Sequence, residues 1–320
     1  MPTIDARARR LVADVGGTNS RLALFDPVAD ELRAVHTYIN RDYQRFEDVV
    51  ATWIGSLCEP APTTCCIAVA APPADDLISM ANMDWAFSCR ELAARFGFTQ
   101  LKPINDFQGN AYALAHLGKD DLVVLHAGRT PKNGKRATVG PGTGLGGSTL
   151  EIVAGRAMAC ACEPGHMGLA PATAIELELF RVLLPHHGEI HAELLVSGPG
   201  LLRLYQGLAA VHGTAPEQLT PEEISRRALQ GQDELCTQSL TIFCALLGSV
   251  CGDFVLANGA YSGLYLAGGI VPQMIPFLHA SNFAQRFRDK GAMTSHLNAV
   301  PLYAITAAYP ALIGAAHAPL

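Results

Sequence analysis

The feature that most constrains this chain is a strand, glycine turn, strand pattern that occurs twice. The first copy spans residues 11–26 and is broken at Gly16 and Gly17. The second spans residues 137–153 and is broken by the glycines of residues 140–147. Because glycine tolerates positive φ and close backbone approach, both segments are predicted to be β-hairpins.

The rest of the chain alternates between short apolar runs and segments with helical spacing. Residues 88–91 also match a helix-opening capping pattern, because Glu91 follows Ser88 by three positions. Apolar spacing and turn residues predict strands at 65–71, 101–106, 263–267 and 299–305, and helices at 46–58, 107–115, 173–184, 199–210, 221–229, 236–251 and 306–316.

This alternation predicts an α/β protein of two lobes that face each other across a central cleft. The chain has 320 residues, and at about 150 residues per domain that length suits one large domain or two ordinary ones. We place the lobe boundary near residue 110. The predicted small lobe comprises residues 1–110 and 300–320, and the predicted large lobe comprises residues 111–299.

Charge and cysteine content exclude several classes of protein. With 23 Lys+Arg against 29 Asp+Glu the net charge is −6, so we expect no nucleic-acid partner. Nine cysteines without a CxxC pair match neither a secreted disulfide framework nor a zinc ribbon, and indicate a cytoplasmic protein. Residues 254–285 lack Asp, Glu, Lys and Arg, but their glycines and prolines predict buried turns rather than a membrane span.

The two glycine turns are candidate phosphate-binding loops, because glycines let backbone N–H groups approach a polyphosphate closely. The P-loop pattern is absent. Gly142, Gly144 and Gly147 match G-x-G-x-x-G, but the run continues into a predicted strand, whereas a dinucleotide fingerprint opens a helix. Either turn alone can also be an ordinary hairpin.

Several polar residues at strand ends can carry chemistry. Asp14 ends an apolar run, where it either caps its own turn or lies near Mg²⁺, directly or through water. Asp106, after Asn105, is either a general base for a hydroxyl group or a helix cap. Glu163 and His166 share one loop and can bind sugar hydroxyls, or they can form a surface turn.

The stretch from His186 to Glu193 contains H-x-E twice. It lacks both H-E-x-x-H and a downstream P-C-x-x-C, so a solvated loop is favoured over a metal site. Cys160 and Cys162 have no third cysteine nearby, and we expect no structural zinc. No G-x-S-x-G elbow is present to support a serine hydrolase.

Taken together, the motifs resemble the bacterial glucokinases of the Gram-negative type, in the actin-like superfamily of sugar kinases and Hsp70 ATPases. They occur in the family's order over nearly the whole chain. The segments that carry the resemblance are LVADVGGTNSRLALFD (11–26), INDFQGNAYAL (104–114), GPGTGLGG (140–147), EPGHMGLAP (163–171), ELLVSGPGLLRLY (193–205), GGIVPQ (268–273) and FRDKGAM (287–293).

The resemblance implies an actin-like (ribonuclease H-like) fold and ATP-dependent phosphorylation of D-glucose to glucose 6-phosphate, a step of glycolysis, with Asp106 as the catalytic base. It implies a homodimer without membrane or nucleic-acid partners, and Mg²⁺ with ATP, near Asp14. The implied sugar ligands are Asn105, Glu163, His166, Glu193 and, more weakly, Asn82. The implied ATP-binding residues are Ala13, Asp14, Val15, Gly16, Gly17, Thr18, Asn19, Gly142, Thr143, Gly144, Gly268 and Gly269.

Two alternatives remain open at this point. The sugar can be another hexose, namely mannose, fructose or an N-acetylated hexosamine, or the chain can be an actin-like ATPase or sugar sensor without kinase activity. The chain also departs from the family pattern: Pro164 stands where glycine is usual, Ala13 where glycine precedes the first aspartate, and Ser20 where alanine is usual. Pro164 restricts the loop that holds Glu163.

Overall fold

The computed structural model describes residues 8–71, 76–80, 83–129 and 134–320. The chain forms two compact units. The first unit contains Met1–Leu117, Val153–Ala161 and Ala307–Leu320, and the second contains Gly118–Ile152 and Cys162–Thr306. The chain therefore changes unit at residues 117/118, 152/153, 161/162 and 306/307, whereas the predicted lobe boundaries lie at residues 110 and 300.

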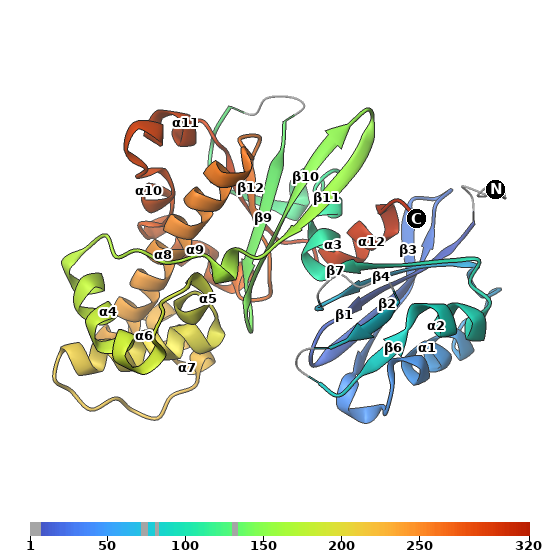
Figure 1. Ribbon diagram of the computed structural model, residues 1–320, viewed down its shortest axis with the longest axis horizontal. Helices are drawn as coiled ribbons and strands as arrows, with labels where there is room; N and C mark the ends of the chain where they lie inside the picture. The colour runs from blue at the N-terminus through green and yellow to red at the C-terminus, as the bar shows by residue number, and fades with distance from the viewer. Residues whose placement is uncertain (1–7, 72–75, 81–82, 130–133) are drawn as a thin grey trace. The chain divides into compact units, whose positions relative to one another are not determined.

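The first unit is built on a five-stranded sheet in the order β3-β2-β1-β4-β7 (Figure 1). β1 pairs antiparallel with β2 and β2 with β3, whereas β1, β4 and β7 run parallel to one another. The first predicted hairpin is therefore confirmed as β1–β2. The strands are β1 (Arg10–Val15), β2 (Asn19–Asp26), β3 (Glu31–Ile39), β4 (Thr64–Val69) and β7 (Gln100–Asn105), with a small separate pair β5 (Leu77–Ser79) and β6 (Ala86–Ser88).

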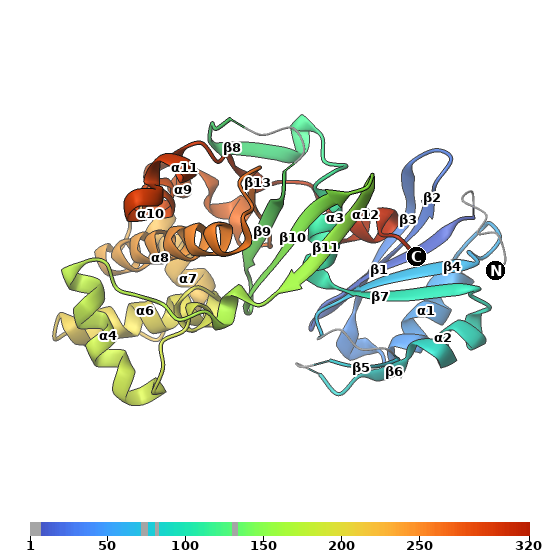
Figure 2. The same ribbon diagram turned by 45° about the horizontal axis from the view of Figure 1, so that its top comes forward.

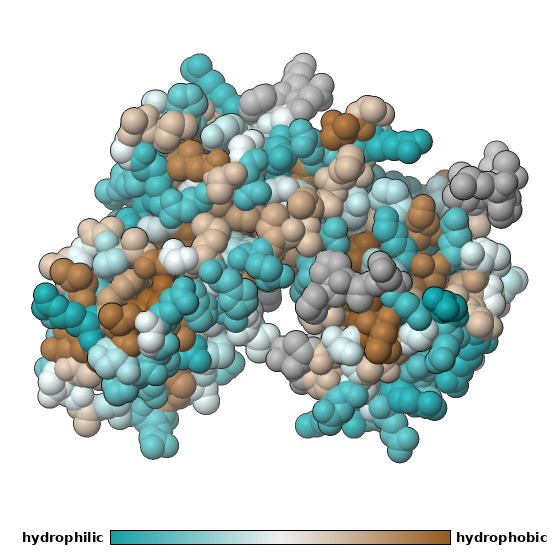
Figure 3. All heavy atoms as spheres, viewed as in Figure 1, coloured by the Kyte–Doolittle hydropathy of each residue, from teal (hydrophilic) through white to brown (hydrophobic). Residues whose placement is uncertain are grey.

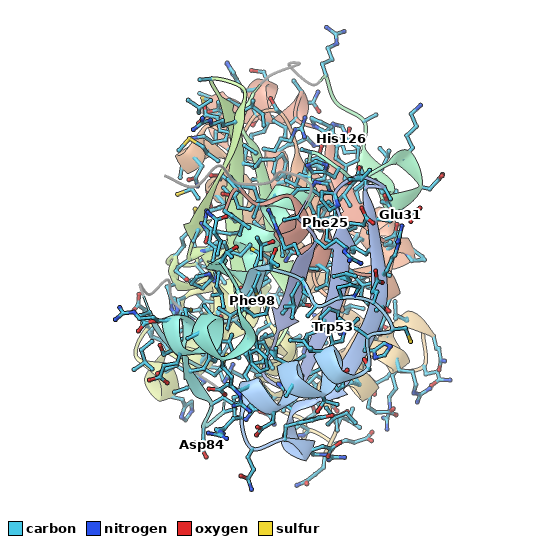
Figure 4. The ribbon with its side chains drawn as sticks, turned by 90° about the vertical axis from the view of Figure 1, so that its right-hand side faces the viewer. Phe25, Glu31, Trp53, Asp84, Phe98 and His126 are labelled. Carbon is cyan, nitrogen blue, oxygen red and sulfur yellow. The ribbon has the colours of Figure 1, made fainter. Side chains whose placement is uncertain are left out.

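Helices cover both faces of this sheet (Figure 2). The apolar core lies on the face covered by α1 (Phe46–Gly55) and α2 (Cys89–Phe96). Trp53, labelled in Figure 4, is fully buried there and donates its Nε1–H to the carbonyl of Ala34 at 2.9 Å. The predicted cap of α2 is confirmed, since the Ser88 hydroxyl accepts from the backbone N–H of Glu91 at 3.1 Å.

The opposite face is covered by α3 (Asp106–Ala113) and α12 (Pro310–His317). These two helices approach so closely that a Cβ on Gly314 would overlap the carbonyl oxygen of Gly109. Arg10 of β1 also donates to the carbonyls of Ala315, Ala316 and Ala318 at 2.7–3.0 Å, which satisfies the carboxyl end of α12. The helix that bears Asp106 is therefore packed on the C-terminal helix of the chain.

The second unit is built on a six-stranded sheet, although part of β11 belongs to the first unit. Its order is β11-β10-β9-β12-β13-β8. The second predicted hairpin is confirmed as β9–β10, which pair antiparallel, and β12 lies parallel between β9 and β13. The strands are β8 (Leu122–His126), β9 (Arg136–Pro141), β10 (Leu145–Val153), β11 (Arg156–Cys162), β12 (Leu264–Leu266) and β13 (Leu302–Ile305).

The helix α8 (Glu234–Asn258) forms the centre of the second hydrophobic core. By length and composition it is the one helix among the described residues that is apolar enough to cross a membrane, and 72% of its apolar window is buried inside the protein. Such burial is typical of a core helix. The other helices of this unit are α4 (Ala174–His187), α5 (Ala192–Leu195), α6 (Gly198–Val211), α7 (Pro221–Leu229), α9 (Ile275–Ala280), α10 (Phe283–Arg288) and α11 (Thr294–Asn298).

A buried ion pair joins two helices of this unit. Arg286 of α10 donates to both carboxylate oxygens of Glu176 in α4, at 2.6 and 3.3 Å, and its Nε–H donates to the hydroxyl of Ser249 at 3.1 Å. The outer face of α4 is exposed to solvent, and it includes the apolar side chains of Leu177 and Leu184. Hydrophobic residues show at the surface over these helices in Figure 3.

Most predicted elements are present, with boundaries that differ by a few residues. One placement was wrong: the last predicted strand was expected in the small lobe with the final helix, but β13 pairs with β12 and β8 in the six-stranded sheet. Sequence proximity to α12 was misleading because the chain passes from the second unit to the first between Thr306 and Ala307, after β13 has ended. The strands β3, β5, β6, β8 and β11 were not predicted.

Candidate active site

The carboxyl ends of three parallel strands lie at one edge of the first unit's sheet. Val15 at the end of β1 is in register with Val69 of β4, and Val69 is in register with Asn105 of β7. The turn that follows β1 and the pair Asn105–Asp106 therefore start from the same edge. Ligands of open α/β sheets bind at the carboxyl ends of their strands.

The turn after β1 is held by a buried asparagine. The N–H of Gly16 donates to the carbonyl of Asn19 at 3.0 Å. Asn40, 1% exposed, donates its backbone N–H to Thr18 O at 2.9 Å and its Nδ2–H to Gly16 O at 2.7 Å, and its Oδ1 accepts from the Ser20 hydroxyl at 2.8 Å. Gly17 and Thr18 are exposed at the tip.

No role was predicted for Asn40 from the sequence. The available signal was Ser20, a polar departure from the family's alanine that needs a partner when it is buried. Hydrogen bonds from the buried Asn40 consequently hold the base of the turn, while the exposed tip stays accessible to a ligand.

Asp14 lies on β1 just before this turn. Its Oδ2 accepts from Arg21 of β2 at 3.0 Å. Burial raises the pKa of the Asp14 carboxyl, and the charge of Arg21 opposes that shift. The neighbouring Ala13 and Val15 have fully buried side chains in the core, so only their backbones are available to a nucleotide.

Asn105 and Asp106 form the start of α3. The Asn105 Oδ1 accepts from the N–H groups of Phe107 and Gln108 at 2.9 and 3.4 Å, which makes Asn105 the N-cap. Asp106 is the first helical residue, and its Oδ1 accepts from Phe107 N–H at 2.9 Å. A carboxylate in the first turn of a helix is stabilised by the helix dipole in its ionised form, which is the form a general base needs.

In the second unit, the glycine loop between β9 and β10 is braced by two other segments. Gly142 N–H donates to Gly144 O at 2.8 Å, and the first N–H of α6, from Gly198, donates to Gly142 O at 2.8 Å. Gly268 has φ +96°, and a Cβ there would lie 2.7 Å from Pro141 O. Only glycine fits this position, and the close approach to Pro141 shows that the predicted residue Gly268 lies beside the loop, with Gly269 next to it in the chain. Thr143 at its tip is exposed.

Glu193 contacts the same loop. Its Oε2 accepts from Leu145 N–H at 2.8 Å. A Cβ on Gly144 would overlap the Glu193 carboxylate, and one on Gly165 would lie 3.1 Å from Oε2. The glycines at 144 and 165 therefore make room for this side chain, which links the loop to the 163–166 turn.

Glu163 and His166 occupy that turn, and both are exposed. His166 N–H donates to Glu163 O at 3.2 Å. An antiparallel bridge between Gly168 and His191 then brings the turn beside α5, and the rings of His166 and His191 lie 5.6 Å apart. The second unit thus assembles its three predicted sugar ligands around one glycine loop.

Pro164, the departure from the family pattern, is buried in this turn. A Cβ on Gly147 would come within 3.0 Å of the Pro164 Cδ and closer to its Cγ, so the proline ring packs on Gly147. Proline suits the first position of the short helix Pro164–His166 because it needs no N–H there.

The remaining predicted positions fall into two groups. Asn82 lies outside the described residues. His186 and His187 end α4, and His191 precedes α5. Among the described residues, no group of three His, Cys, Asp or Glu side chains is arranged to hold a metal ion.

Comparison with known proteins identifies the family. The glucokinase family model matches residues 11–319. A glucokinase of Saccharophagus degradans is 38% identical over 309 residues, or 96% of each chain. A glucokinase of Psychromonas ingrahamii is 40% identical over 305 residues, or 95% of each chain.

The architecture agrees with this match. The crystal structure of a glucokinase from an Antarctic psychrotroph is similar with a TM-score of 0.88 and 37% identity, covering 97% of this chain and 98% of that one. The two α/β units, each with a glycine hairpin, are thus those of the two-lobed actin-like fold of sugar kinases. The chain belongs to the glucokinase family.

Proposed function

We propose that this chain transfers the γ-phosphoryl group of ATP to the 6-hydroxyl of D-glucose, with Asp106 as the general base. Membership of the glucokinase family supports the reaction. The observation that supports the assignment of Asp106 is the strand register, which starts the glycine turn and Asn105–Asp106 from the same sheet edge.

In this proposal Asp106 accepts the proton of the sugar hydroxyl while that oxygen attacks the γ-phosphorus. Phosphoryl transfer depends mainly on positioning and charge stabilisation. Asn105, Glu163, His166 and Glu193 position the sugar through its hydroxyls. The backbone N–H groups of residues 16–19 and 142–144, with Gly268 and Gly269, bind the nucleotide.

A magnesium ion bound with ATP would neutralise phosphate charge. Asp14 suits a hydrated Mg²⁺, because it supplies carboxylate oxygen and this metal usually keeps several waters in phosphate sites. Arg21 occupies its Oδ2, which favours contact through water. No larger cage of acidic or histidine side chains occurs in the described part of the chain, so we assign the other ligands to phosphate and water.

The test of the base is Asp106→Ala. General-base catalysis contributes about 10²–10⁴-fold, so kcat is expected to fall by at least about 100-fold while glucose still binds. A coupled assay for glucose 6-phosphate measures the rate. Asp48→Ala, which removes a first-turn acid of α1 in the same unit, is the matched control. Near-full turnover in Asp106→Ala would refute the assigned role.

The test of the sugar ligands is Glu163→Ala and His166→Ala. Each is expected to raise KM for glucose by about 5–30-fold, because a lost hydrogen bond to a sugar hydroxyl costs about 1–2 kcal/mol, while KM for ATP stays the same. A raised KM for ATP with an unchanged KM for glucose would contradict the assignment of these residues to the sugar. Running the assay with mannose, fructose and N-acetylated hexosamines, and without sugar, separates glucose specificity from the two alternatives.

The proposal also includes a cytoplasmic location and a homodimer, both supported by the resemblance to the family. Sedimentation velocity at micromolar concentration tests the dimer: a single species near 68 kDa is expected, twice the chain mass of 33.9 kDa, and a species at the chain mass contradicts it.

A further inference from the structure

The side chain of Gln108 links the start of α3 to a neighbouring strand. Its Oε1 accepts from the backbone N–H of Asn105 at 3.0 Å, which completes a capping box with the Asn105 side chain. Its Nε2–H donates to the carbonyl of Ala159 in β11 at 3.1 Å. One carboxamide therefore uses both of its ends, and both contacts lie within the first unit.

The two ends of the Gln108 carboxamide have different chemical requirements: one must accept a hydrogen bond and the other must donate one. A capping box needs only an acceptor at the third helical position, and glutamate or glutamine supplies it equally well. The bond to Ala159 needs a donor, which glutamate lacks when it is ionised. Ala159 lies on β11, an edge strand of its sheet, and an edge strand has a row of backbone groups without a strand partner. Gln108 supplies a donor to the carbonyl of Ala159 on this edge strand.

The position of Gln108 gives the link its significance. The capped residue, Asn105, and the next residue, Asp106, are the proposed sugar ligand and base. The Asn105 Oδ1 also accepts from the N–H of Gln108 at 3.4 Å. The side chain of each of these two residues is therefore hydrogen-bonded to the backbone N–H of the other. Rotation of this helix start would move the Asp106 carboxylate relative to its substrate, and misplacement by about 1 Å can cost about 100-fold in rate.

We propose that Gln108 is a positioning residue for the phosphoryl transfer: by bridging Asn105 and Ala159 it sets the orientation of the Asp106 carboxylate. This rests on the proposed function, since it acts through Asp106. Gln108 itself is assigned no contact with substrate. Its contribution is to turnover rather than to nucleotide binding.

The first experiment compares Gln108→Ala with Gln108→Glu. The alanine variant loses both bonds, and kcat is expected to fall about 10–100-fold with KM for ATP unchanged and a lowered Tm. The glutamate variant retains the capping acceptor, so its Tm is expected to recover, but kcat stays low because the donor to Ala159 is missing. Recovery of kcat together with Tm in Gln108→Glu would overturn the role of the Ala159 bond.

A matched control separates positioning from general loss of a cap. Ser88→Ala removes the N-cap of α2 in the same unit, and it is expected to lower Tm without changing kcat. If Ser88→Ala and Gln108→Ala reduce kcat equally at equal loss of Tm, Gln108 is a structural residue only and the proposal is wrong.

The second experiment is a double-mutant cycle with Asp106→Asn. If Gln108 acts through the carboxylate, Gln108→Ala has little further effect on kcat in the Asp106→Asn background; additive losses overturn the proposal. The single variant Asp106→Asn distinguishes a failure of the proposed base from a failure of the positioning role. Full turnover in that variant refutes the proposed base, whereas a large loss there with normal turnover in Gln108→Ala refutes only the positioning role.

Discussion

At the scale of single residues, buried polar side chains shape the candidate site as much as the groups expected to touch substrate. Ser20 and Asn40 bond to each other, and Asn40 bonds to the backbone of the first glycine turn at two further points. Three hydrogen bonds, one made by its backbone N–H and two by its side-chain amide, thus meet at the buried residue Asn40. Because each buried bond that is left unmade costs about 1–3 kcal/mol, this amide limits the shapes available to the turn.

Replacement of Asn40 is therefore predicted to affect the nucleotide more than the sugar. Asn40→Ala removes the side-chain bonds to Gly16 and Ser20, together with the Nδ2 contact to Met83 Sδ at 3.6 Å, and is expected to raise KM for ATP about 10-fold, with KM for glucose unchanged. Ser20→Ala removes only one of them and is expected to produce a smaller increase. Initial rates at varied ATP and varied glucose measure both constants. Equal KM values for ATP in wild type and Asn40→Ala would show that the turn keeps its shape without this residue.

At the scale of elements, the packing of α3 on α12 depends on two histidines as well as on glycines. The rings of His116, just after α3, and His317, in α12, stack in parallel with centroids 3.4 Å apart. The ring of Phe25, which is labelled in Figure 4, lies edge-to-face with that of His317, with centroids 5.1 Å apart. Burial lowers the pKa of His317 to about 4, with a further lowering by His116, and burial also lowers the pKa of His116.

The charges that face this pair act in opposite directions. Asp30 lies 3.3 Å from the His317 Nε2 and raises the pKa values of both histidines, whereas Arg10 lowers that of His317. Burial dominates, so both rings are neutral at pH 7. A group whose pKa is lowered by folding binds more protons in the unfolded chain. The free energy of unfolding is therefore highest above about pH 6.5, where the histidines are neutral in both states. It decreases as the pH falls towards 4, because only the unfolded chain takes up protons there.

The wild-type protein is accordingly predicted to lose about 1–2 kcal/mol of stability through this pair between pH 7 and pH 5, after allowance for solvent screening of half-buried groups. His317→Phe keeps a stacking ring but cannot be protonated, and its stability is expected to depend less on pH. Urea unfolding at pH 7, 6 and 5 measures the difference. His279→Phe, at an exposed position, is the control, and an equal pH dependence of wild type and His317→Phe would exclude the pair as its source.

At the scale of the whole molecule, the proposed function draws on residues of both units: the sugar ligand Asn105 and the base Asp106 belong to the first, and the sugar ligands Glu163, His166 and Glu193 belong to the second. Each unit has its own hydrophobic core. A ligand that binds only the folded protein stabilises it by mass action, by about 2.7 kcal/mol at 100 times its Kd. If the sugar is held by groups of both units, its binding stabilises both.

Saturating glucose is therefore predicted to raise Tm and to protect both units from hydrogen exchange. Protection is expected at the start of α3 in the first unit and at residues 163–166 and 192–195 in the second. Hydrogen exchange read by mass spectrometry, with and without glucose, resolves the two sets of peptides. Glu193→Gln, which weakens one ligand of the second unit, is expected to reduce protection in both sets. Protection confined to one unit would mean that the sugar is bound by that unit alone.

The sequence by itself determined the features that depend on neighbouring residues. Both glycine hairpins, the cap of α2 by Ser88 and the helix after Asp106 follow from local backbone conformation and short-range hydrogen bonds, and all are present. The family followed too, because its motifs are contiguous segments that keep their order along the chain. The alternation of strands and helices was sufficient to predict two α/β lobes.

Only the tertiary structure decided which distant residues meet. Asn40 reaches Gly16, Gln108 reaches Ala159, Glu193 reaches Leu145 and β13 joins the second sheet through contacts between segments that are far apart in sequence. Hydropathy and turn patterns carry no information about such pairs, because burial and hydrogen bonding are satisfied by whichever segments the packing of the two sheets brings together.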